Sequence, residues 1–349
     1  MKILLRLFIL VLAWVALLRP GTASGQTPTL EFAPGAGNPT GNGATTADQV
    51  ITLQNNTDNP TGTTFVAYTP TTTVTFALSN QQYFPIVTRA STGTGVAFGE
   101  NISGTGLLNA NAPLFSPLNT YGGATAANFT STSGVVGGIS ATANYGTEIF
   151  LTTEALNNPV PANARYQFAD LTLTFSQPMV NPVIHVSGMG GNFNTVGFST
   201  ELDLLTTGVT LSRLSGSTEL NINATQILNS ATNPGPNTGA GAASGSVLVT
   251  TGSAGITTLV FRLYLRTGAT GGDINGNTLL SHTGDAWLMS VSRLTPIALT
   301  GYVFEDVNYG GGAGRPRTAT GAAVRSGATV ELYDNAGTFV ATTTTDATG

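Results

Sequence analysis

The sequence of 349 residues has no cysteine, only 8% charged residues and a single lysine, Lys2. Without cysteine the chain is not a small disulfide-stapled domain. Charged residues make up about 25% of a typical globular domain, so other polar residues must fill most surface positions. Threonine and asparagine fill them, with 58 and 27 copies. The mean hydropathy of +0.16 is too high for a disordered chain.

The N-terminus has the layout of a secretory signal peptide. Lys2 and Arg6 flank the start of an apolar run, Leu7 to Leu18, and small residues occupy positions 22–25. This run is shorter than the about 20 residues that span a membrane. We therefore predict a signal peptide over residues 1–25, secretion or display at the cell surface, and no membrane span in the mature chain. An uncleaved anchor is the alternative.

Removal of residues 1–25 would leave nine arginines, no lysine and all 17 acidic residues, a net charge of −8. Nucleic-acid-binding proteins need a stripe of lysine and arginine, and attraction to anionic lipids needs the same charges. We therefore predict no nucleic-acid partner. The missing lysine also excludes a phosphate-binding loop of the Gly-Lys-Ser/Thr type.

Short runs of alternating apolar and polar residues dominate the rest of the chain. Such alternation is typical of β-strands with one buried face. The clearest runs lie at residues 73–78, 171–175, 200–204, 209–213, 259–266 and 287–291. After the leader, no stretch of ten or more residues has a helical stripe. We predict an all-β fold, with a large β-sandwich or jelly-roll domain followed by a smaller module.

The domain boundaries follow from changes in composition. Residues 26–296 could form one β-sandwich domain, since all-β domains reach about 250 residues. Two packed sandwiches that divide near residues 119–138, a stretch rich in Gly, Thr and Ser, are the alternative. A second stretch of this kind, residues 233–246, predicts an exposed loop between strands. The last module spans residues 297–349.

The last module predicts a strand, a glycine-rich loop, a second strand and a final strand over residues 338–345. Its pattern consists of Gly301, Val303, Phe304, Asp306, Asn308, Gly327, Val330, Leu332, Asp334, Gly337, Val340, Thr345, Asp346 and Gly349. This pattern resembles the B-type modules of serine–aspartate-repeat and collagen-adhesin surface proteins, which have an Ig-like (prealbumin-like) sandwich. The resemblance implies a stalk or spacer of an exported bacterial protein. That family continues with two more strands, so we expect a partial module of a longer chain.

The resemblance also implies a calcium site, because many serine–aspartate-repeat modules bind calcium after their Phe-x-Asp-x-Asn start. Asp306 and Asn308 match that start, and Asp346 is the third candidate ligand. No acid follows in residues 309–315, whereas calcium takes six to eight oxygen ligands. A depleted calcium site and a set of Asx turns are therefore the two alternatives, and no other cofactor is expected. The lysine–asparagine isopeptide bond of many collagen-adhesin modules cannot form in a lysine-free mature chain.

Motifs for catalysis are few. His185 lies in an apolar strand-like run, which favours a hydrogen-bonded residue on a strand face over a zinc ligand. Glu201 and Asp203 share one strand face about 7 Å apart, a separation that glycosidase carboxyls can have. The alternation around them favours an ordinary solvated face instead. The glycines at residues 188–191 predict a tight turn.

We therefore expect an exported, non-enzymatic protein of the cell surface or extracellular matrix, acting in adhesion or envelope structure. A surface glycan or a protein would be its ligand. The alternative is a carbohydrate-binding module or a polysaccharide-acting enzyme on the same scaffold. For that alternative, exposed aromatic residues would stack on a sugar ring, and the candidates are Tyr83, Tyr121, Tyr145 and Tyr264.

Overall fold

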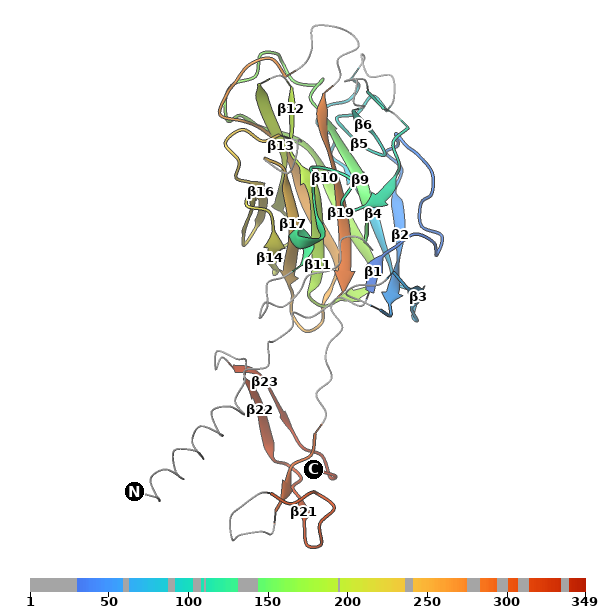
Figure 1. Cartoon of the computed structure of the whole chain (residues 1–349), viewed down its shortest axis with the longest axis vertical. Helices are drawn as coiled ribbons and strands as arrows, with labels where there is room; N and C mark the ends of the chain where they lie inside the picture. Colours follow the sequence, from blue (N-terminus) through green and yellow to red (C-terminus); the bar gives the residue numbers. More distant parts are fainter. Residues whose placement is uncertain are drawn as a thin grey trace, which may run out of the picture. The chain divides into compact units, whose positions relative to one another are not determined.

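The computed structural model describes residues 30–58, 63–86, 92–102, 108–109, 111–130, 144–193, 195–235, 241–274, 283–293, 301–306, 314–333 and 339–349. Within these ranges there is no α-helix, and one short 3-10 helix spans Ala126–Phe129. The strands pair in antiparallel fashion, as Figure 1 shows. The predicted all-β fold is confirmed. The chain divides into two compact units, Met1–Thr295 and Pro296–Gly349.

The first unit contains a sheet that we call the β11 sheet. Its central strands follow in the order β14 (Thr210–Gly216), β17 (Ala243–Thr250), β11 (Pro182–Met189) and β19 (Gly284–Arg293). Along its other edge, β19 pairs with β9 (Tyr145–Thr152) and with β1 (Leu30–Phe32). Two further strands, β5 (Val96–Phe98) and β8 (Phe115–Pro117), pair with β9. β2 (Gln49–Asn56) pairs with β1, and β3 (Phe65–Ala67) pairs with β2.

The second sheet, which we call the β18 sheet, packs face to face with the first. Its order is β15 (Leu220–Asn223), β16 (Gln226–Asn229), β13 (Val196–Leu204), β18 (Ile256–Thr267), β10 (Arg165–Met179), β4 (Thr73–Ser79) and β2. The short strand β12 (Gly191–Phe193) also pairs with β13. Because β2 pairs within both sheets, the sandwich is nearly closed into a barrel along that side. A separate pair is formed by β6 (Asn101–Ile102) and β7 (Leu108–Asn109).

One core lies between the two sheets and is built by the alternation seen in the sequence. Every second residue of β18 and β19 points inward, and these side chains are fully buried: Leu259, Phe261, Leu263, Leu265, Trp287, Met289 and Val291. Ile184 and Val186 of β11 lie beside Val291 and Met289 in the same sheet and belong to the same core. Burial of one such side chain contributes about 1.5–3 kcal/mol. A single contiguous core of this size holds the sandwich together without disulfides.

The glycines at residues 188–191 do not form the predicted tight turn. They carry the chain from the end of β11 in one sheet to β12 in the other. Gly188 and Gly190 have φ values of 81° and 142°, which favour glycine. A side chain at Gly191 would lie 2.4 Å from the ring of Phe198. These glycines therefore allow the chain to cross between the sheets at close quarters.

The predicted exposed loop over residues 233–246 is wrong at its C-terminal end. Residues from Ala243 onward belong to β17, and Ser244 and Ser246 are buried. These small residues fit a crowded place, since a side chain at Gly245 would lie 2.5 Å from the backbone of Gly216 on β14. Composition alone did not reveal this strand because it lacks large apolar residues at its start.

Residues 118–130, which we call the cover segment, lie across the outer face of the β11 sheet. Its residues Leu118, Ala124 and Phe129 form a small apolar cluster with Leu288 of β19. The hydroxyl of Ser187 donates to the carbonyl of Leu118, and that of Ser215 donates to Asn128 at 2.8 Å. A side chain at Gly122 would lie 2.5 Å from Cα of Gly188. This close packing buries an outer sheet face that would otherwise meet water.

The second unit consists of two small antiparallel pairs in its described residues. β20 (Phe304–Glu305) pairs with β21 (Ala323–Val324), and β22 (Thr329–Tyr333) pairs with β23 (Phe339–Thr344). β23 lies where the last strand was predicted. The resemblance to B-type modules stays a prediction.

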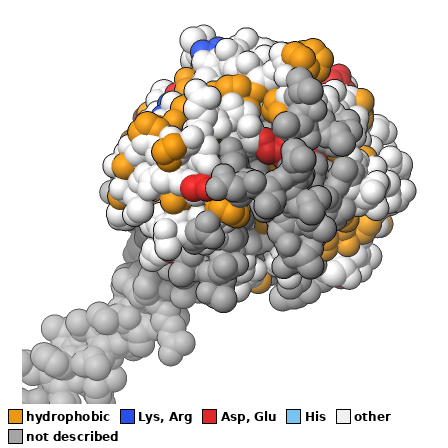
Figure 2. Space-filling view, turned by 90° about the horizontal axis from the view of Figure 1, so that it is seen from above, with side chains coloured by type: hydrophobic (Ala, Val, Ile, Leu, Met, Phe, Trp, Pro, Cys, Tyr) orange, Lys and Arg blue, Asp and Glu red, His pale blue; other side chains and the backbone are white. Residues whose placement is uncertain are grey.

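Uncharged side chains dominate the surface, as the composition requires. On the face seen in Figure 2, hydrophobic side chains are scattered among polar uncharged side chains and backbone, and charged side chains are few. Among the residues that the structure describes, no helix has the length and apolar character to cross a bilayer.

Candidate functional site

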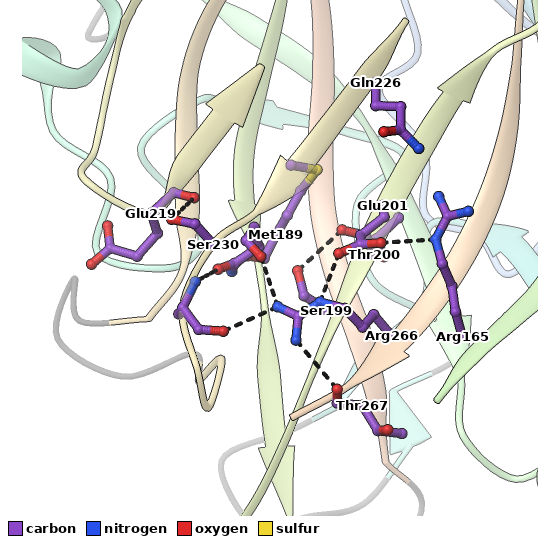
Figure 3. A network of polar contacts seen from close by, with 12 residues as sticks. Arg165, Met189, Ser199, Thr200, Glu201, Glu219, Gln226, Ser230, Arg266 and Thr267 are labelled. Carbon is purple, nitrogen blue, oxygen red and sulfur yellow. Dashed lines mark hydrogen bonds and ion pairs between the residues drawn. The ribbon is translucent and has the colours of Figure 1, made fainter. Parts of the chain in front are cut away.

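The densest cluster of charged side chains lies on the outer face of the β18 sheet. Arg165 starts β10, Glu201 and Asp203 lie on β13, and Arg266 lies on β18 between those strands. Figure 3 shows how Arg165 and Arg266 converge on Glu201. Period-2 alternation places them on one face, because Leu202, Leu263 and Leu265 point into the core.

Glu201 is held by two arginines. Arg165 Nε lies 2.9 Å from one carboxylate oxygen of Glu201, and Arg266 Nε lies 2.7 Å from the other. Arg165 also binds Asp203 with both terminal nitrogens, at 3.0 and 2.7 Å. The guanidinium of Arg165 lies over the ring of Tyr264, 3.6 Å from its centre. The group therefore forms a clamp that ties β10 to β13 across β18.

The predicted solvated face for Glu201 and Asp203 is wrong for Glu201, which is 4% exposed. The reason is that Arg165 and Arg266 come from other strands and cover it. Partial burial acts to raise the pKa of Asp203, but hydrogen bonds from Arg165 and Gln226 outweigh it and hold the pKa below its usual value. An ionised, arginine-paired aspartate is a poor proton donor. This pair therefore suits a structural link better than acid–base chemistry.

Arg266 also ties the clamp to the backbone, because its terminal nitrogens donate to carbonyl groups. One terminal nitrogen donates to the carbonyls of Asn229 and Ala231, at 2.7 and 3.0 Å, and the other donates to Thr267. On the same face, Arg262 binds Asp170 through Nε at 2.8 Å, and this bond lowers the pKa of Asp170. The charges on this face are thus paired with one another.

The tyrosines proposed for sugar stacking do not present free rings. Tyr83 packs on Phe168 at 4.7 Å between ring centres, and Tyr145 packs on Phe115 at 5.3 Å. Tyr264 lies beneath Arg165, and Tyr121 belongs to the half-buried cover segment. None of the four is exposed, so the prediction of exposed aromatic residues is wrong at these positions.

The candidate calcium ligands have local partners. One carboxylate oxygen of Asp306 accepts from the backbone N–H of Arg315 at 2.8 Å. Asp346 accepts from the backbone N–H and the hydroxyl of Thr348, both at 2.7 Å, which lowers its pKa. Asn308 lies outside the described residues. No group of three or more His, Asp or Glu that could hold a metal occurs in the described part of the chain, and calcium binding stays a prediction.

His185 is a hydrogen-bonded strand residue, as predicted. It is fully buried beneath the cover segment, and its ring nitrogens lie 2.8 Å from the hydroxyls of Ser246 and Ser292. The ring of Phe129 packs against it, with 6.2 Å between centres. Burial lowers the pKa of His185 to about 3, so the imidazole is neutral at physiological pH. His282 lies outside the described residues.

Asp285 is a buried acid that sequence reasoning missed. It is 1% exposed and points toward the core from β19. Its two oxygens accept from the backbone N–H groups of Gly190, at 2.9 Å, and Thr200, at 2.6 Å. Burial raises its pKa to about 6, although both backbone bonds act in the opposite direction. The side chain fastens β19 to the point where the chain crosses between the sheets.

Glu148 is a second buried acid that the sequence did not reveal. It lies on β9 directly opposite Leu288, on the face closed by the cover segment. The side chain is fully buried and neither carboxyl oxygen has a well-aligned hydrogen bond. Burial raises its pKa to about 8, while Tyr121 and Asn101 act to lower it. Burial also raises the pKa of Tyr121, whose hydroxyl accepts from the Asn101 amide at 2.8 Å.

Comparison of the chain with protein-family models, with curated proteins and with solved structures finds no match.

Proposed function

We propose that this chain is an exported, non-enzymatic protein of the cell surface or extracellular matrix that acts in adhesion or envelope structure. The observation that carries the proposal is the leader pattern of residues 1–25, with its positive start, short apolar run and small residues. The leader is followed by an all-β unit with few charged residues and then by a smaller β unit.

The chemistry of the first unit supports a structural role. Its most charged face is closed on itself, because Arg165 and Arg266 neutralise Glu201 and Asp203. The buried histidine is hydrogen-bonded to two serines and neutral at physiological pH. These groups stabilise the sandwich and leave uncharged hydroxyls and amides as the main surface for a ligand.

Export is tested by cell fractionation of the full chain in a bacterial host, followed by N-terminal sequencing of the processed form. We expect a mature protein that starts at residue 26 and lies outside the cytoplasm. The double variant Leu10→Arg/Leu12→Arg breaks the apolar run and should retain the chain inside the cell. The control Val50→Arg/Val66→Arg makes the same kind of change at two exposed strand positions and should leave export intact.

The non-enzymatic part is tested with the exported protein. Binding to cells or matrix proteins without turnover of polysaccharides is the expected result. Hydrolysis of a polysaccharide by the purified chain would overturn that part, and a wild-type chain found only in the cytoplasm would overturn the whole proposal.

A further inference from the structure

The outer face of the β18 sheet carries threonines on four neighbouring strands, β2, β4, β10 and β18. Alternation turns these side chains outward, because their neighbours along each strand, such as Val74 and Leu173, point into the core. We call this group the threonine field, and it consists of Thr52, Thr73, Thr75, Thr172, Thr174 and Thr258. These residues are far apart in the sequence, and the pairing of the strands brings them together.

The strand registers align the field in rows that run across the sheet. Thr75 of β4 lies opposite Thr174 of β10, and Thr174 lies opposite Thr258 of β18. In the row on one side of this one, Thr73 lies opposite Thr52 of β2. Neighbouring strands lie about 4.8 Å apart, and every second residue of a strand lies about 6.7 Å further along it. The threonines therefore stand on a grid with two regular spacings.

The field is uncharged, and its hydroxyls have no hydrogen-bond partners within the protein. Thr174 and Thr258 are exposed and the other four threonines are half-buried. No residue of the described chain hydrogen-bonds to any of the six hydroxyls. The rows also contain Val50, Ala77 and Val260, which are apolar. Because a β-branched side chain is stiff at χ1, the hydroxyls and methyl groups hold fixed positions on the grid.

A ligand that matches this face has to be neutral and has to repeat its hydrogen-bonding groups in a lattice. The field contains no aromatic ring for a sugar to stack on, and Tyr264 further along the face lies beneath Arg165. Ice is a neutral lattice whose oxygen atoms repeat on the same scale of a few ångströms. A hydroxyl has one donor and two acceptor sites, so it fits into such a lattice in the place of a water molecule.

We propose that the threonine field binds ice. The free hydroxyls would hold a layer of ordered water, and the methyl groups of the threonines and the apolar side chains in the rows would pack against it. Fixed side chains lower the entropy cost of this contact. The proposal does not rest on export, since a purified chain is sufficient to test it.

The extent of the field limits the expected activity. The ion pair of Asp170 and Arg262 occupies the row next to Thr172 and Val260, and charges orient water toward themselves. Neighbouring strands also rotate by about 20–25° relative to one another, so a flat crystal face meets only a few strands at a time. We therefore expect a protein that shapes ice crystals and slows their growth, with a modest depression of the freezing point.

The test is the growth of single ice crystals in solutions of residues 26–349, which keep both units, over a series of protein concentrations. We expect faceted crystals and a gap between the melting and growth temperatures that widens with concentration. Thr174→Tyr puts a bulky ring at the centre of the grid and should reduce this gap several-fold. Thr210→Tyr is the matched control and should leave the gap unchanged, because Thr210 is also an exposed strand residue but lies on β14 in the other sheet.

A second variant makes the result independent of one position. Thr258→Tyr lies in the same row one strand away and should reduce the gap as Thr174→Tyr does. Tyrosine is a strong strand former, and thermal unfolding of each variant checks that the sandwich remains folded. A wild-type chain that leaves ice growth unchanged would overturn the proposal, as would equal losses for Thr174→Tyr and Thr210→Tyr. Binding to crystalline cellulose or chitin without any effect on ice would overturn it in favour of a polysaccharide surface.

Discussion

Glu148 offers a sharp test of the buried charge beneath the cover segment. Burial in the folded state raises the pKa of Glu148 to about 8 from its ordinary value of 4.5. A carboxyl with a raised folded-state pKa contributes stability below its unfolded pKa and loses it as pH rises through the folded value. The free energy of unfolding should therefore fall as pH rises toward 8. We predict that Glu148→Gln, which cannot ionise, removes this fall.

The magnitude follows from the pKa. Between pH 6.5 and pH 9 the folded protein loses one proton that the unfolded chain has already lost. From pH 6.5 to pH 8, a span of 1.5 units, this difference in bound protons lowers the free energy of unfolding by about 2 kcal/mol. His185 and Asp285 do not interfere, because their folded and unfolded pKa values all lie at or below about 6.5. The variant should be the more stable protein, and its advantage in free energy of unfolding over the wild type should grow by about 2 kcal/mol from pH 6.5 to pH 9.

The assay is urea unfolding at several pH values, followed by the fluorescence of Trp287. This is the one tryptophan after residue 25 and it is fully buried. Glu219→Gln is the control. Burial acts to raise the pKa of Glu219, but hydrogen bonds with backbone groups and Ser217 lower it below the usual value, so it stays ionised throughout. The reasoning is refuted if Glu148→Gln keeps the wild-type pH dependence or if wild type shows none.

Three further predictions concern the remaining buried and paired groups. Asp285→Ala leaves the buried N–H groups of Gly190 and Thr200 without acceptors. It should lower the free energy of unfolding by about 2–4 kcal/mol at pH 7. A loss below about 1 kcal/mol in urea unfolding would contradict this prediction. Arg165→Ala, which frees two acids including the nearly buried Glu201, should destabilise by about 1–3 kcal/mol. Arg262→Ala frees Asp170 alone and should cost less than about 1 kcal/mol. Equal losses for the two variants would argue against the clamp. Burial lowers the folded-state pKa of His185, so its stability contribution is present above pH 6.5 and is lost as pH falls toward 3. His185→Asn should remove that component, and an unchanged acid limb in its unfolding profile would speak against it.

The strands were the most predictable part of this protein. Period-2 alternation predicted the strands β4, β18 and β19, because each turns every second side chain into the core. The same alternation places Asp285 on the inward face with Trp287 and Met289. That signal was available, but a local pattern does not show that two backbone N–H groups from distant strands converge on the carboxylate.

The environment of the charged residues was less predictable for the same reason. Alternation correctly placed Glu201 and Asp203 on one face, yet Glu201 is buried by Arg165 and Arg266 from neighbouring strands. The cover segment presents a second case. Its Gly, Thr and Ser residues suggested a division between two sandwiches as the alternative, whereas Gly122 packs on Gly188 over the outer face of a sheet. Burial set by contacts between distant segments is not encoded in a local period.

The pairing of β1 with β19 has a mechanical consequence. Leu30, where β1 begins, is directly opposite Arg293, where β19 ends, so the chain enters and leaves the sandwich at neighbouring points. A pull that separates these two residues would peel the strands apart one hydrogen bond at a time, because the load falls on the terminal pair first. Strands loaded from opposite ends share the force among all their bonds. This sandwich is therefore built to be held from one end, with little tension passing through its body.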